Sequence, residues 1–100
     1  MPLEAAIRKR LEETRGPVQA SDLMAHLERD GIFIVGVTES LVECGVAVAM
    51  DDVDRVGAMI DSGTLRKPTQ AERDHWKATP TARVIAIVVQ PFVLVQRLPD

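Results

Sequence analysis

A chain of 100 residues has room for one hydrophobic core, so we expect residues 1–100 to fold as a single domain. Hydrophobic residues make up 46% and charged residues 27%, a globular composition that excludes a disordered chain. A net charge of −3, with one Trp, two Phe and no Tyr, argues against nucleic-acid binding, which needs a basic face or stacking aromatics.

The chain is predicted to begin with two helices. Over residues 3–15 the apolar side chains recur every four positions, which predicts a charged helix with a narrow apolar stripe, ended by the Gly-Pro pair that follows. Ser21 is a suitable N-cap for a second helix over residues 22–30. Gly31 can close that helix in the left-handed conformation.

Two strands are then expected. The β-branched and aromatic residues 32–35 predict the first. Over residues 46–50 large and small side chains alternate with period two, which favours a strand whose small face packs against a helix. A buried helix is the alternative, because Ala and Leu tolerate either state. If residues 46–50 are a strand, the segment from Val46 to Leu65 could form a right-handed βαβ crossover.

Two helices with strong start signals follow. Asp51 is expected to cap a helix whose first turn holds Asp52 and Asp54, and Gly63 predicts its end. A short extended piece over 64–67 is expected, because Pro68 disfavours helix in the residue before it. Thr69 and Glu72 form a capping box, which predicts a polar helix to about residue 77.

The aliphatic run over residues 84–95 predicts two strands, or one strand broken at Pro91, buried on both faces. The order of elements predicts an α+β fold. We expect one mixed or mainly antiparallel sheet of about four strands, with three to four helices packed on it.

A single cysteine excludes an internal disulfide and any CxxC motif. Residues 1–4 lack the apolar core of a signal peptide, and no segment approaches the ~20 apolar residues that span a bilayer. We therefore expect a cytoplasmic protein that does not act at a membrane.

Short motifs spread over nearly the whole chain resemble a small bacterial family. They are LVE at 41–43, VAVA at 46–49, the Asp pair at 51–52, Lys-Pro at 67–68, Trp76 and QPFVLVQ at 90–96. The family is domain of unknown function 2288. The Cys44-Gly45 pair departs from the regular aliphatic alternation of that family. The resemblance implies a bacterial cytoplasmic protein and carries no activity and no functional residues.

Glu43, Asp51 and Asp52 are the candidate site residues. Gathered at one corner, they could hold a divalent metal or act as an acid–base pair, with the pKa of Glu43 raised in an apolar pocket. Helix capping explains the aspartates more simply, and an ion pair with an arginine such as Arg83 explains Glu43. Trp76 is either a core residue or an interface anchor.

The remaining chemical groups predict no site. Cys44 lies among aliphatic residues, which favours an inert buried thiol. His26 and His75 have no zinc-ligand spacing. GxSxG, Walker and GxGxxG patterns are missing from the sequence, so it predicts no cofactor.

The leading hypothesis is a small non-enzymatic interaction or accessory module that acts as a homodimer. It rests on the aliphatic run at 84–95, because so short a chain has few other residues with which to bury both faces of that run. The alternative is a small enzyme or divalent-metal binder that uses Glu43, Asp51 and Asp52.

Overall fold

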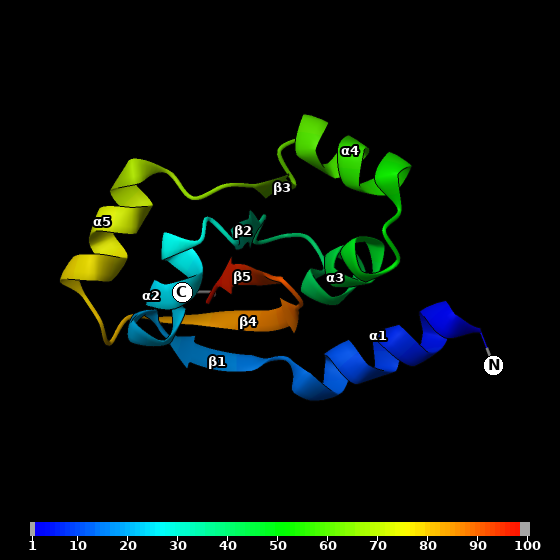
Figure 1. Ribbon diagram of the computed structural model, residues 1–100, viewed down its shortest axis with the longest axis horizontal. Helices are drawn as coiled ribbons and strands as arrows, with labels where there is room; N and C mark the ends of the chain where they lie inside the picture. The colour runs from blue at the N-terminus through cyan, green and yellow to red at the C-terminus, as the bar shows by residue number, and fades with distance from the viewer. Residues whose placement is uncertain (1, 99–100) are drawn as a thin grey trace.

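The computed structural model describes residues 2–98 and shows an α+β fold built on one five-stranded mixed sheet (Figure 1). Along the chain the elements are α1 (Leu3–Thr14), β1 (Gly16–Gln19), α2 (Ala20–Glu28), β2 (Ile32–Val35), α3 (Leu41–Ala49), α4 (Val53–Asp61), β3 (Leu65–Arg66), α5 (Gln70–Ala78), β4 (Arg83–Val89) and β5 (Phe92–Arg97). The sheet order is β1-β4-β5-β2-β3. Neighbouring strands are antiparallel except β2 and β5, which are parallel.

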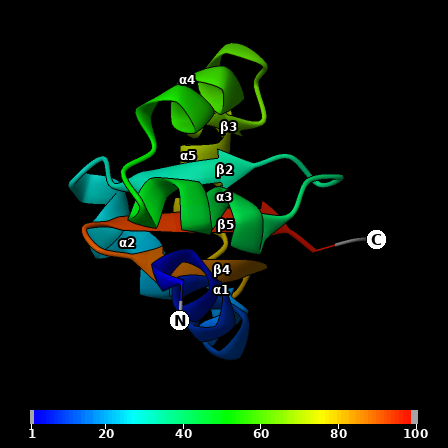
Figure 2. The ribbon, with the colours of Figure 1, turned by 90° about the vertical axis from the view of Figure 1, so that its right-hand side faces the viewer.

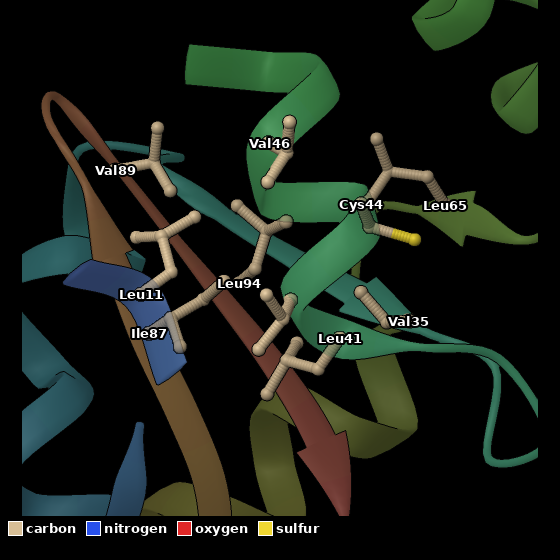
Figure 3. Packing of buried hydrophobic residues seen from close by; sticks show 10 residues of the cluster. Leu11, Val35, Leu41, Cys44, Val46, Leu65, Ile87, Val89 and Leu94 are labelled. Carbon is tan, nitrogen blue, oxygen red and sulfur yellow. The ribbon is translucent and has the colours of Figure 1, made fainter. Parts of the chain in front are cut away.

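Helices lie on both sides of the sheet, with α1, α3 and α4 on one side and α2 and α5 on the other (Figures 1 and 2). Side chains of a strand point alternately to the two sides, so β4 sends Ile87 and Val89 toward α1 and α3, and Val84 and Ala86 toward α2 and α5. Two apolar cores result, one on each side of the sheet. Figure 3 shows the core on the side of α1 and α3, where Leu94 of the central strand β5 lies among side chains of these two helices.

The C-terminal run forms two strands that meet at Pro91, the first of the two predicted alternatives, and the strands pair as a β-hairpin. Strands β4 and β5 pair from Val84–Arg97 to Val89–Phe92, with Gln90 and Pro91 in the turn. Helices cover both faces of this hairpin, so the run does not need a partner chain to bury it. Val88, at 50% exposure, is its one strongly exposed large hydrophobic residue.

The prediction of a strand over residues 46–50 is wrong, and the alternative of a buried helix is correct. Ser40 caps α3 through its hydroxyl, which accepts a hydrogen bond from the backbone N–H of Glu43 at 3.2 Å. Gly45 lets the helix approach the sheet closely, because a Cβ at this position would lie 2.4 Å from Cδ1 of Ile87. The proposed βαβ crossover is therefore also wrong, and β3 instead pairs antiparallel with β2.

Strand β1 was not predicted, and together with α3 it brings the described chain to five strands and five helices. β1 lies at the edge of the sheet. Pro17 is tolerated there because an edge strand does not need the backbone N–H that proline lacks, whereas a central strand would. The second helix begins one residue before Ser21, with Gln19 as its N-cap. Asp30, with a φ of 57°, takes the left-handed position expected of Gly31.

The other predicted helix starts and ends agree with the structure to within one residue. The cap of α4 is Asp52, one residue after the predicted Asp51, which instead takes the turn before the helix. Gly63 has a φ of 79° just after α4, and Thr69 and Glu72 form the expected capping box of α5. Within residues 2–98, none of the helices combines the length and the apolar character that crossing a membrane requires.

Candidate functional site

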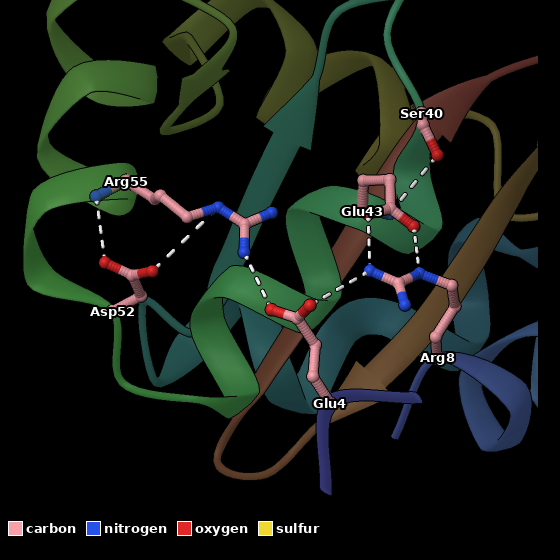
Figure 4. A network of polar contacts seen from close by, with 6 residues as sticks. All are labelled: Glu4, Arg8, Ser40, Glu43, Asp52 and Arg55. Carbon is pink, nitrogen blue, oxygen red and sulfur yellow. Dashed lines mark hydrogen bonds and ion pairs between the residues drawn. The ribbon is translucent and has the colours of Figure 1, made fainter. Parts of the chain in front are cut away.

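The structure does not gather the three predicted carboxylates into one site. Glu43 lies on α3 and forms a two-pronged ion pair with Arg8 of α1, with Nε to Oε2 at 2.6 Å and Nη2 to Oε1 at 2.9 Å (Figure 4). The predicted partner, Arg83, is not the one used. Arg8 also contacts Glu4 at 3.5 Å, and Glu4 reaches Arg55 at 3.1 Å. These pairs link α1, α3 and α4.

Glu43 has the electrostatics of a structural anion. Hydrogen bonds from the Arg8 guanidinium hold the pKa of Glu43 below its ordinary value, against a smaller opposing effect of desolvation. A general acid at neutral pH needs the opposite shift. Glu43 therefore stays ionised and committed to Arg8.

Asp51 and Asp52 serve the local backbone. The Asp52 carboxylate accepts a hydrogen bond from the N–H of Arg55 at 3.2 Å, which is helix capping. Asp51 occupies the turn between α3 and α4 with a φ of 53°. Across residues 2–98, three or more His, Cys, Asp and Glu side chains never come close enough together to hold a metal ion.

Cys44 is buried in the core between α1, α3 and the sheet. Desolvation raises the pKa of its thiol, so the reactive thiolate is disfavoured. The expectation of an inert thiol agrees with this position.

Two hollows in the described part of the chain are candidate sites. The first, here called the α4 hollow, has a volume of about 340 Å³. It lies under α4 and is almost entirely apolar, with two aromatic rings, Phe33 and Phe92, packed edge to face at 5.5 Å between centroids. Its lining consists of Phe33, Val48, Asp51, Val53, Val56, Gly57, Ile60, Leu65 and Phe92.

The second hollow, here called the α5 cleft, has a volume of about 400 Å³. It lies between α5 and the sheet, on the opposite side from the α4 hollow, and combines an apolar floor with charged side chains. Its lining consists of Ile34, Ala71, Glu72, His75, Trp76, Ala82, Arg83, Val84, Val95, Arg97 and Leu98.

Trp76 lines the α5 cleft and also belongs to the core between α2, α5 and the sheet. It is 6% exposed, so it is a core residue with one edge toward the cleft. The other cleft residues were not found from the sequence. Arg97 carried a usable signal, because it lies two positions after Val95 and alternation puts both on the same face of β5.

The comparisons agree with this architecture. No curated protein matches the chain. The fold is similar to the NMR solution structure of PA1075 from Pseudomonas aeruginosa, with a TM-score of 0.77 and 26% identity over 96% of this chain and 88% of that chain. A family model described as protein of unknown function, DUF2288, matches residues 6–97, and the chain belongs to this family, as its motifs predicted.

Proposed function

We propose that the protein is a non-catalytic interaction module of the bacterial cytoplasm, and that it acts as a homodimer through α4. The observation that carries this proposal is the exposure of the apolar face of α4. Val53 is 74% exposed and Ile60 is 50% exposed, and none of the nine residues of α4 is buried.

The apolar residues of α4 fall on one face of the helix. Val53, Val56 and Ile60 follow the i, i+3, i+7 pattern, and all three line the α4 hollow. A surface helix normally buries such a face against its own core. Here Val56 and Met59 pack partly against the core, while Val53 and Ile60 stay exposed beside an open apolar hollow. An exposed apolar surface of this kind marks a protein contact.

A second copy of the chain fits this surface because the surface carries both projecting apolar side chains and a hollow that can receive such a side chain. Val53 and Ile60 project, and the hollow beside them is large enough for an aliphatic side chain. In a two-fold interface each copy inserts its projecting residue into the other's hollow, so the contact forms twice. A nine-residue helix is about 13.5 Å long, so the interface is small and we expect dissociation in the micromolar range.

Sedimentation velocity over micromolar to millimolar concentrations tests the proposal. The wild type is expected to shift reversibly from monomer to dimer, and Ile60→Asp to stay monomeric because it places a charge in the contact. Val37→Asp is the matched control, since Val37 is 65% exposed but lies in the loop between β2 and α3. A wild type that remains monomeric throughout would overturn the dimer, and equal loss in the control would overturn its placement on α4.

A further inference from the structure

We propose that the α5 cleft binds a small organic acid, with the carboxylate at Arg97 and an aromatic or aliphatic body against Trp76. This inference is independent of the dimer, because the cleft and the α4 hollow lie on opposite sides of the sheet.

The floor of the cleft is apolar and already formed. Ile34, Trp76, Val84 and Val95 line it, and all four belong to the packed core between α2, α5 and the sheet. A volume of about 400 Å³ falls in the range of small-molecule sites, which combine an apolar lining with a few polar groups. The floor therefore selects a ligand with an apolar body.

The charged groups at the cleft select an anion. Arg97 follows Val95 by two positions on β5, so alternation directs it to the side of the sheet that carries α5. His75 also lines the cleft, and so does Arg83, although alternation along β4 directs the Arg83 side chain to the other side of the sheet. Among residues 2–98, neither Arg83 nor Arg97 forms an ion pair.

The single carboxylate in the described lining, Glu72, does not oppose this charge. Its two oxygens accept hydrogen bonds from Arg66 at 2.7 and 3.0 Å, and one of them also accepts from the N–H of Thr69 at 2.8 Å. The negative charge of Glu72 is thus matched by Arg66, and Arg97 leaves the cleft with an excess of positive charge.

A carboxylate is the anion that this chemistry fits. A guanidinium offers two parallel N–H donors, which match the two oxygens of a carboxylate. A ligand that joins a carboxylate to a phenyl or short alkyl group could reach Arg97 while its body covers the exposed edge of Trp76.

The chain supplies its own reporter for the test, because Trp76 is its one tryptophan and there is no tyrosine. Fluorescence of Trp76, excited selectively, is followed while 3-phenylpropionate is added, and the neutral 3-phenylpropanamide is the matched probe. We expect a saturable change, with the acid binding about tenfold or more tightly than the amide. Arg97→Gln is expected to remove this preference while leaving amide binding unchanged.

Arg97→Lys, which keeps the charge but lacks the two-pronged donor, is expected to lose part of the preference. Arg10→Gln removes an exposed charge from α1 and should bind as the wild type does. Circular dichroism establishes that each variant is folded. No saturable change up to roughly 10 mM, equal binding of acid and amide, or equal loss in Arg97→Gln and Arg10→Gln would each overturn the proposal.

Discussion

Helices α3 and α4 make the most instructive comparison in this molecule. Each has nine residues, both lie on the same side of the sheet, and only three residues separate them. Each is capped in the same way, with Ser40 or Asp52 accepting a hydrogen bond from a backbone N–H three residues later at 3.2 Å. Yet α3 buries six of its residues and α4 buries none.

The difference shows that local signals decide where a helix starts, while the distribution of its apolar residues decides how much of the helix is buried in the core. Glu43 is the one charged residue of α3, so almost its whole circumference can enter the core. In α4 three charged residues, Asp54, Arg55 and Asp61, confine the apolar side chains to one face. That face remains available for contact.

The largest expected contrast comes from truncating one aliphatic side chain in each helix. Leu41→Ala should lower the free energy of unfolding by about 2–5 kcal/mol, because Leu41 is buried in α3 and its loss leaves a cavity. Ile60→Ala should cost less than about 1 kcal/mol, since the side chain is half exposed. Urea denaturation at one low protein concentration measures both, and equal losses would contradict the comparison.

The same substitution in the two helices should have opposite effects. Gly45→Ala should lower the free energy of unfolding by about 1–3 kcal/mol, because its Cβ would press on Ile87 and Leu11. Gly57→Ala should raise it by about 0.5–1 kcal/mol, because its Cβ meets no atom within 4 Å and alanine favours helix.

Denaturation of the two glycine variants checks the signs. The added substitution Ile87→Val removes the crowding atom, so it should cost less in the Gly45→Ala background than in the wild type. If the two losses simply add, the close approach of α3 to β4 is not what constrains Gly45.

A third nine-residue helix, α5, extends the comparison, because it buries only Trp76 and is anchored by polar contacts. Hydrogen bonds from Arg66 lower the pKa of Glu72 from 4.5 to about 2. Because the folded state has the lower pKa, the pair stabilises the fold above pH 4.5, and this stabilisation is lost as the pH falls toward 2. Solvent screening at the 44% exposed Arg66 reduces the effect to about 1 kcal/mol.

Glu72→Gln keeps the capping box but removes the charge, so it isolates this effect. The variant should be less stable than the wild type near neutral pH, and the difference should vanish near pH 2. Glu28→Gln, at an exposed position on α2, is the control and should follow the wild type. A difference that does not change with pH would mean that the ion pair contributes no stability.

The sequence predicted the elements whose signals are local. The Asp51-Asp52 pair locates the start of α4 to within one residue, and Thr69 identifies the start of α5, because capping involves residues three positions apart. Pro91 identifies the hairpin turn because it cannot donate to a ladder. The same reasoning explains why β1 was missed: its single valine gives no strand pattern, and β4, its one partner in the described sheet, is more than 60 residues away.

The sequence misassigned α3 because its alternation of large and small residues suits a strand as well as a buried helix. Contacts of Gly45 with distant Ile87 decide between the two states, and these contacts are tertiary. The predicted site of three carboxylates was wrong for the same reason, because the contacts of its residues are also tertiary. Glu43 is paired with Arg8, 35 positions earlier, and the α5 cleft is built from four separate elements, β2, α5, β4 and β5.

The position of β5 has a consequence for how the protein folds. This strand lies at the centre of the sheet between β4 and β2, yet it is the last element of the chain. Because β5 pairs in parallel with β2, which lies far earlier in the sequence, completing the sheet must bring distant segments together, and such non-local contacts slow folding. The protein is therefore expected to fold more slowly than a helical bundle of the same length.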